Sequence, residues 1–571
     1  MKRFLFFTSV VALGLVMGSC NDLKKMVANA DDINYSVEPK VLEVHNGQVA
    51  VNIKGNFPEK YFRKKVSATA TPTLVWDGGE KALTPIYIQG EKVSGNGQVI
   101  KYKTGGSFSY NDKFDYSPEM RRSKLVLKIT AVKGTKEAEF DPEDIAEGIV
   151  ATPELVKMNG GKSSNAASNF KKDNTTSRIA AINYDKNKAE IKSSETKKSE
   201  ITEMQQYIKD SKGNDRIKFE GVELKSYASP EGTQDINKKV SNDRSNSASK
   251  FAKNEFKGVN GADGSNFFKT LVTEEDWDGF KTAVQNSNLA DKDMIIRVIN
   301  MNSDPDKREE EIRNMKNTFD ELEKEVLPSL RRSEIVINVT NIGKTDDEIA
   351  KQYKDDPSKL SFTEIMHYGE ITEDAAKRVE IYTKATELYP DEWSAYNNLG
   401  AALYETKDYQ AAKVALEKAK SKSNGNATVL NNMGNVALSE GNVAEAESNY
   451  ASATGVSEAS AGQGVIAIKK AQYANASNFY GDDCSFNAGL AKVLNKENDA
   501  ALKALDCGAE KDDAMNYYLK AVVCARKTDN EGVFNNLRTA CQKDSSLKDF
   551  AAKDVEFINL FENETFKSIV K

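Results

Sequence analysis

The chain has 571 residues, of which 39% are hydrophobic and 29% charged, and its formal net charge is −6. This length exceeds what one hydrophobic core usually serves, so three or four domains are expected. The composition excludes a largely disordered chain, and the net charge gives no reason to expect nucleic acid or anionic lipid as a partner.

The chain begins with the pattern of an export signal. A basic start leads into an apolar run over residues 4–17, which is short for a membrane span and suits a secretory leader. Small residues then precede Cys20, an arrangement that resembles the lipobox of bacterial lipoproteins. The resemblance implies a signal peptide over residues 1–19 and lipidation of Cys20, and the alternative is an ordinary leader cut near Ser19. Several acyl chains would hold the chain firmly on a membrane.

Residues 20–35 are polar and are predicted to be a tether, and residues 36–150 an antiparallel β-sandwich. Short segments with alternating apolar residues recur in this second range, separated by Gly, Asp and Asn turns. Asn46-Gly47 is a hairpin signal between two such segments. Nothing in the range suggests catalysis, so the sandwich is expected to be a spacer or an interaction module.

Residues 151–177 are predicted to be a linker. Their larger part, residues 157–176, is rich in Gly, Ser, Asn and Lys, which is typical of flexible connections between domains.

A strand–turn–helix motif follows. A strand pattern ends at Tyr227, the turn Ala228-Ser-Pro-Glu-Gly232 comes next, and a helix pattern carries Asn237, Ser241 and Arg244. This resembles the core of the OmpA-like peptidoglycan-binding domain, and the Arg-Arg pair before a last apolar strand, within residues 327–339, fits the same family. The resemblance implies an α/β domain over residues 178–341, with an insertion at about 258–305.

In that family an acidic turn residue and the helix arginine contact diaminopimelate, and an arginine fork suits a carboxylate. The corresponding peptidoglycan-binding positions here are Arg244, Ser229, Gly232 and Asn237, with Glu231 as a substitute for the acidic residue. Ser229 stands where the acid is expected and cannot supply its charge. The alternative is that Arg244 is structural and that the domain keeps the fold without a ligand.

The last third of the chain repeats with a period of 34 residues. Gly400 and Gly434 are 34 residues apart, and so are Ala412 and Ala446. This resembles the tetratricopeptide repeat, and it predicts an all-α solenoid of five to six repeats over residues 359–545 with a capping helix over 546–571.

Two asparagine pairs lie in the first helices of the central repeats. In this family such helices line the concave face, and asparagines there commonly hold an extended peptide backbone. The resemblance therefore implies a protein or peptide partner on the repeats; the alternative is a rigid spacer. The predicted partner-binding residues are Asn397, Asn398, Asn431 and Asn432.

Cysteines and histidines give little support for chemistry. Only two histidines occur, far apart in the sequence, which argues against a histidine-based metal site or a Ser-His-Asp triad. Export makes disulfides possible, and four cysteines allow three pairings, but buried thiols explain them equally well. No enzyme activity, cofactor or metal is expected. The four cysteines are Cys484, Cys507, Cys524 and Cys541.

The turn and the Arg-Arg ending resemble the version of this domain found in Bacteroides-type bacteria, which implies a multidomain lipoprotein of such a bacterium. We expect it to be anchored by lipid alone in the outer membrane, to face the periplasm, and to act as a cell-envelope scaffold. The central domain would contact peptidoglycan peptide, and the repeats would recruit a protein. The alternative is a surface-exposed binding or adhesion lipoprotein. An acidic run after Cys20 would favour surface export, and residues 21–25 are not such a run.

Overall fold

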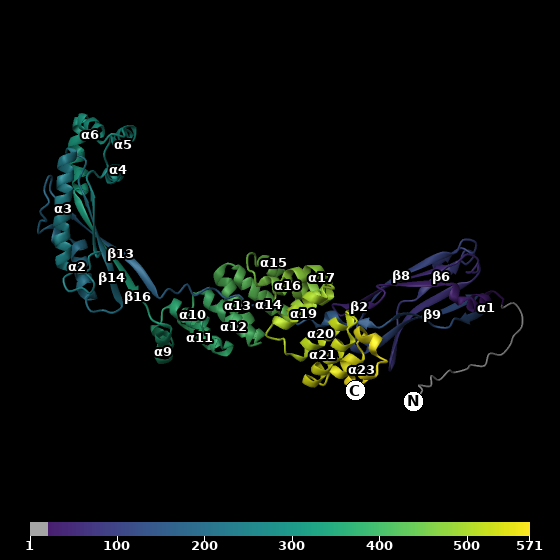
Figure 1. The fold of residues 1–571 in the computed structure, drawn as a ribbon. Coiled ribbons are helices and arrows are strands. Elements are labelled where there is room, and N and C mark those ends of the chain that lie inside the picture. The colour runs from purple at the N-terminus through teal and green to yellow at the C-terminus, as the bar shows by residue number, and fades with distance from the viewer. Residues whose placement is uncertain (1–20) are drawn as a thin grey trace. The chain divides into compact units, whose positions relative to one another are not determined.

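The computed structural model describes residues 21–571, so the predicted signal peptide and Cys20 lie outside the described residues. The chain forms two compact units (Figure 1). Unit 1 combines the chain up to Ala167 with Thr372–Lys571, and unit 2 is Ser168–Ile371. Within the described part, none of the helices is both long and apolar enough to cross a membrane.

The N-terminal part of unit 1 is β-rich, as predicted, and consists of two sheets. The strand order of the first sheet is β1-β3-β2-β12, and β8 also pairs with β3. The strand order of the second sheet is β10-β9-β4-β6-β7, where β11 also pairs with β9 and β5 with β4. Most neighbours are antiparallel, but β12 pairs with β2, and β7 with β6, in parallel. The first sheet contains β1 (Asn34–Glu38), β2 (Leu42–His45), β3 (Gln48–Phe57), β8 (Gly106–Asp115) and β12 (Ile149–Val150). The second contains β4 (Ser67–Trp76), β5 (Gly79–Ala82), β6 (Ile86–Gly90), β7 (Gln98–Ile100), β9 (Ser123–Lys133), β10 (Lys136–Glu139) and β11 (Glu143–Glu147).

Local sequence explains how this part folds. Side chains of β3 alternate between buried and exposed, so one face contributes to the core. The β2–β3 hairpin turns at Asn46 and Gly47, which both have positive φ, as a two-residue turn of this kind requires. The expected tether is partly ordered: helix α1 (Asn21–Ala28) places Leu23 and Met26 in the core of the β-rich part.

Unit 2 contains a four-stranded sheet in the order β13-β16-β14-β15, with helices α2 and α3 packed against it. Strand β15 lies in the range expected as an insertion, yet it extends the sheet by pairing in parallel with β14. The core joins apolar residues of the sheet and of α2 with aromatic residues that follow α3. These elements are β13 (Asp173–Asn183), α2 (Ser199–Ser211), β14 (Ile217–Tyr227), α3 (Gln234–Glu255), β15 (Phe268–Thr273) and β16 (Arg332–Ile342).

Helices between β15 and β16 build a second, smaller core in unit 2. They are α4 (Trp277–Asn286), α5 (Lys292–Met301), α6 (Pro305–Asn314), α7 (Lys316–Glu325) and α8 (Leu327–Leu330). Unit 2 ends with α9 (Asp346–Asp355) and α10 (Phe362–Glu370), each of which begins with a capping box.

The C-terminal part of unit 1 is a solenoid of helical hairpins, which confirms the predicted repeats (Figure 1). Glycine permits the close approach of paired helices: a Cβ on Gly400 would lie 2.5 Å from the Leu416 side chain, and one on Gly434 would lie 2.6 Å from Tyr450. The hairpins comprise α11 (Ala375–Leu388), α12 (Trp393–Glu405), α13 (Tyr409–Ser423), α14 (Ala427–Ser439), α15 (Val443–Ser452), α16 (Ala459–Lys469), α17 (Tyr473–Tyr480), α18 (Phe486–Leu494), α19 (Asn498–Cys507), α20 (Ala514–Arg526) and α21 (Asn530–Lys543). The expected capping helix is instead α22 (Leu547–Ala552), a 3₁₀ turn over Val555–Leu560, and α23 (Glu564–Val570).

Candidate functional site

The concave side of the repeats holds the chain's own segment 157–166, which we call the groove segment. It has no helix or strand of its own. The asparagines that face it lie on α12, α14 and α18 and are buried. The predicted peptide-binding residues therefore do contact an extended backbone, and that backbone belongs to the same chain.

Three asparagines bind the groove segment through paired hydrogen bonds. Asn432 accepts from the Ser164 amide at 2.9 Å and donates to the Ser164 carbonyl at 2.7 Å. Asn398 binds both backbone groups of Ala166 in the same way, at 2.8 and 2.9 Å. One 34-residue step along the repeats thus matches two residues of extended peptide. Asn487 on α18 does the same for Lys157, at 2.9 and 2.8 Å.

Other repeat side chains complete this contact. Asn397 donates to the Ser164 carbonyl at 3.2 Å, and Asn431 and Asn435 donate to the Lys162 carbonyl at 2.9 and 2.8 Å. The Tyr404 hydroxyl donates to the carbonyls of residues 159 and 161. Buried backbone groups need such partners, and the repeats supply them.

Two glycines fit the groove segment to the repeats. A Cβ on Gly160 would lie 2.1 Å from Asn487 Nδ2, and a Cβ on Gly161 would lie 2.1 Å from Asn435 Oδ1. At these two adjacent positions only glycine fits without displacement of an asparagine.

Ion pairs add to the contact. Lys157 Nζ lies 2.6 Å from Glu510, and Lys162 Nζ lies 2.8 Å from Asp483. Burial disfavours the charged form of Asp483, but hydrogen bonds from Lys162 and the Ser485 hydroxyl outweigh it and lower the pKa of Asp483 below its ordinary 3.8.

This pKa shift predicts an acid-sensitive contribution to stability. A carboxylate with a lowered pKa stabilises the fold above pH 3.8 and loses that contribution as the pH falls through its folded pKa. We expect wild type to be more stable than Asp483→Asn at neutral pH and the difference to shrink in acid. Urea unfolding of both proteins over a pH series measures this, and a difference independent of pH would contradict it.

Sequence reasoning treated the groove segment as linker and missed Asn435, Asn487 and Tyr404. A signal for Asn487 was present, because it precedes Gly489 by two residues just as Asn432 precedes Gly434. The repeat between them has Gly462 at this position, where a Cβ would lie 2.1 Å from the Tyr450 ring.

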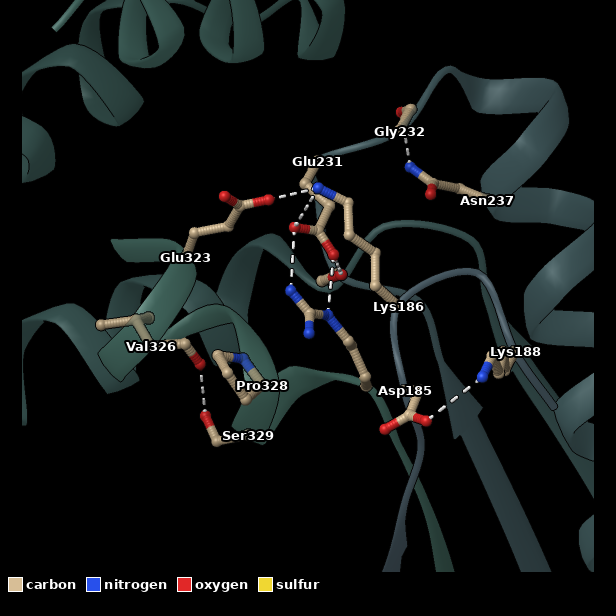
Figure 2. Close-up of polar contacts among 12 residues, drawn as sticks. Asp185, Lys186, Lys188, Glu231, Gly232, Asn237, Glu323, Val326, Pro328 and Ser329 are labelled. Carbon is tan, nitrogen blue, oxygen red and sulfur yellow. Dashed lines mark hydrogen bonds and ion pairs between the residues drawn. The ribbon is translucent and has the colours of Figure 1, made fainter. Parts of the chain in front are cut away.

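The strand–turn–helix motif of unit 2 centres on Glu231, which belongs to a buried ion pair (Figure 2). Arg331 donates from Nε and Nη2 to the two carboxylate oxygens of Glu231, at 2.7 and 3.0 Å. The two side chains are only 10% and 4% exposed. The Ser229 hydroxyl donates to Glu231 at 2.7 Å, and Lys186 lies 3.7 Å from it. The turn therefore contains an acidic residue, Glu231, but its negative charge is compensated by Arg331 of the same unit.

Arg244 is 1% exposed and holds backbone together. It donates to the carbonyls of Asp185, Lys188 and Tyr227 at 3.1, 3.0 and 2.9 Å. Burial lowers its pKa to about 10. These bonds tie the loop after β13 to the end of β14.

The remaining motif residues stabilise the start of α3. Asn237 donates to the Gly232 carbonyl at 2.7 Å and to Glu275 at 3.2 Å (Figure 2). All five predicted residues therefore lie in one region of unit 2, where their partners include each other, the backbone and the side chains of Lys186, Glu275 and Arg331. What is open to solvent is a charged rim around the buried pair, formed by Asp185, Lys186, Lys188, Lys192 and Glu323.

The four cysteines within residues 21–571 divide into a disulfide pair and two thiols. Cys484 and Cys507 form a disulfide that joins the loop before α18 to the end of α19. Cys524 and Cys541 are free and buried, and burial raises the pKa of both thiols. Across residues 21–571, no group of His, Cys, Asp and Glu side chains is arranged to hold a metal ion.

No protein-family model matches the chain, and no curated protein is significantly similar to it. Among solved structures, the APC/C hetero-tetramer Cut9–Hcn1 matches at 15% identity over 39% of this chain and 45% of that chain, with a TM-score of 0.31. A tetratricopeptide repeat protein from Parabacteroides merdae ATCC 43184 matches at 12% identity over 39% and 89%, with a TM-score of 0.27. Pseudomonas aeruginosa pilF matches at 17% identity over 38% and 98%, with a TM-score of 0.28. Similarity at this level assigns no family to the chain.

Proposed function

We propose that this chain is a non-enzymatic cell-envelope scaffold, anchored in the outer membrane through lipid on Cys20 and facing the periplasm. Its unit 2 would contact peptidoglycan peptide. The observation that carries the scaffold role is the groove segment, whose backbone is bound by repeat asparagines at Lys157, Ser164 and Ala166. The Cys484–Cys507 disulfide is consistent with an exported protein.

Because the groove segment occupies the concave side, the repeats hold the stretch of chain that leads into unit 2. Unit 2 begins at Ser168, two residues after Ala166, and its chain returns at Thr372, just before α11. Mechanical force applied at Ser168 would therefore be transmitted to the repeats through the hydrogen bonds between Ala166 and Asn398, and no flexible linker would absorb it. A connection of this kind suits a protein that joins a membrane to the cell wall.

A protein partner on the repeats remains part of the proposal, with a constraint. A peptide that enters the concave groove must displace the groove segment and must present glycine opposite Asn435 and Asn487, where Gly161 and Gly160 lie now. Displacement also sacrifices the ion pairs of Lys157 and Lys162.

The charged rim supports the peptidoglycan contact. Cell-wall peptides carry carboxylates and an ammonium group on diaminopimelate, and the rim presents both signs of charge. Lys188 and Lys192 are 64% and 53% exposed and share Asp185 as a partner. Exposed pairs of this type contribute little to folding, so their lysines are free to exchange partners.

Sedimentation with peptidoglycan sacculi tests this contact. Lys188→Glu/Lys192→Glu should lower retention about tenfold, because it removes charge-assisted hydrogen bonds to ligand carboxylates. The matched control is Lys250→Glu/Lys257→Glu, which changes the charge equally at exposed positions on and after α3. Arg244→Ala is the weaker test, since its buried side chain holds the fold.

Two outcomes decide between the readings. Loss of retention in the rim variant alone, with unchanged circular dichroism, supports peptidoglycan contact. Equal and low retention of all three proteins contradicts it. That result would favour the alternative function, a surface-exposed binding or adhesion lipoprotein whose central domain keeps the fold without ligand. The ion pair between Glu231 and Arg331 is compatible with this alternative, because Glu231 already has a partner within the chain.

A further inference from the structure

A basic hollow of about 290 Å³ lies at the end of the β-rich part that carries the start of the chain. Asp22 and Tyr102 line it together with five cationic side chains. These are Arg63, Lys64, Lys65, Lys92 and Lys133.

An aromatic ring, as well as acids, positions the cations of this hollow. The Arg63 guanidinium donates to the Tyr102 hydroxyl at 2.9 Å and lies 5.2 Å from the centre of its ring. Lys64 Nζ lies 5.8 Å from the same ring. Cation–π contacts of this kind hold positive charge in place without neutralising it.

The charge of the hollow is only partly compensated. Asp22 lies 2.5 Å from Lys133 and 3.7 Å from Arg63, and Glu91 lies 3.1 Å from Lys64. Lys65 and Lys92 make no ion pair within residues 21–571. Five cations thus face two carboxylates, although the whole chain has a net charge of −6. This local excess fits an anionic ligand.

The hollow also lies close to the predicted anchor in the sequence. Asp22 follows Cys20 by two residues, which span at most about 7 Å of extended chain. Helix α1 is fixed to the β-rich part by buried Leu23 and Met26 and by a 2.6 Å hydrogen bond from the Tyr61 hydroxyl to the Met26 carbonyl. Acyl chains on Cys20 would therefore bring the hollow to the level of the lipid headgroups.

We propose that the basic hollow binds the phosphate of anionic lipid headgroups, so that this end of the β-rich part lies on the membrane surface. The inference rests on the proposed anchor at Cys20 and adds a second, electrostatic contact to it. Basic residues near an anionic surface gain attraction within about a Debye length, and a lipid anchor strengthens when a basic patch accompanies it.

Vesicle sedimentation tests the proposal with residues 21–571, which contain every residue of the described cores. We expect binding to vesicles of equal parts phosphatidylglycerol and phosphatidylcholine, and none to phosphatidylcholine alone. Lys65→Glu/Lys92→Glu should weaken the binding at least about tenfold, since each charge near the surface contributes roughly fivefold. The control Lys503→Glu/Lys511→Glu makes the same charge change at exposed positions of the repeats and should bind as wild type does.

Binding equal in both variants, or absent from wild type, would overturn the proposal. Saturable binding of inorganic phosphate without vesicle binding would overturn it as well, because it would assign the hollow to a free anion. Palmitate labelling of the full chain and of Cys20→Ser reports on the anchor alone. Palmitate label without vesicle binding would support the anchor and refute the headgroup contact. Vesicle binding without label would support the headgroup contact and refute the anchor.

Discussion

Replacement of Asn398 and Asn432 by alanine should release the groove segment from the repeats. Each asparagine makes two hydrogen bonds to one residue of the segment, Ala166 or Ser164. Four bonds at roughly 0.5–1.5 kcal/mol each give a loss of about 2–6 kcal/mol, and the backbone groups left behind would be unpaired unless they reach water. The amides and carbonyls of Ser164 and Ala166 can form hydrogen bonds with water once the segment detaches. The detached state should therefore become populated.

Limited trypsin digestion reads this release directly, because Lys157 and Lys162 are cleavage sites inside the groove segment. Mass spectrometry should find rapid cleavage at Lys162, the lysine nearer to the released residues, in the double variant and slow cleavage in wild type. The control is Asn475→Ala/Asn478→Ala on α17, where both side chains are exposed. Gly161→Leu, whose side chain would collide with Asn435, should reproduce the effect from the segment. Unchanged cleavage in both test proteins would show that the asparagines do not hold the segment.

Loss of Arg331 should destabilise unit 2 more than loss of any exposed arginine. Arg331→Met removes two hydrogen bonds from Glu231 and leaves that buried carboxylate with Ser229 and the more distant Lys186. Removal of one partner from a buried ion pair costs about 3–5 kcal/mol, since the remaining charge loses its close counterion. We expect this cost in the free energy of unfolding of unit 2.

Trp277 is the tryptophan of unit 2, so its fluorescence in a Trp76→Phe/Trp393→Phe background follows this unit during urea unfolding. Arg216→Ala is the matched control: its 2.7 Å pair with Glu348 is exposed and should contribute less than about 1 kcal/mol. Arg331→Met/Glu231→Leu should recover much of the loss because the buried carboxylate left by the single substitution is then absent. Equal effects of Arg331→Met and Arg216→Ala would contradict the structural role of the pair.

Sequence alone predicted the features whose cause is local or periodic. The Asn46-Gly47 hairpin follows from two residues that tolerate positive φ. The 34-residue period marks the glycines where paired helices meet, and with them the asparagines that bind the groove segment. The strand, turn and helix around residues 217–255 also occur where the motif places them.

What the sequence could not predict depends on backbone groups or on distant partners. The groove segment is bound through its amides and carbonyls, which every residue has, so its composition indicated only a flexible linker. The same holds for Arg244, which binds three carbonyls. Glu231 finds Arg331 across 100 residues of sequence, and no local pattern reveals that the turn acid is already paired.

Amide hydrogen exchange of the wild-type chain tests most directly whether the groove segment is bound within its own chain. The structure predicts that the amides of Lys157, Ser164 and Ala166, which donate to Asn487, Asn432 and Asn398, are protected at any protein concentration. Residues 171 and 172, which are exposed, should exchange rapidly. Exchange of the three groove amides as fast as that of residues 171 and 172 would contradict the account.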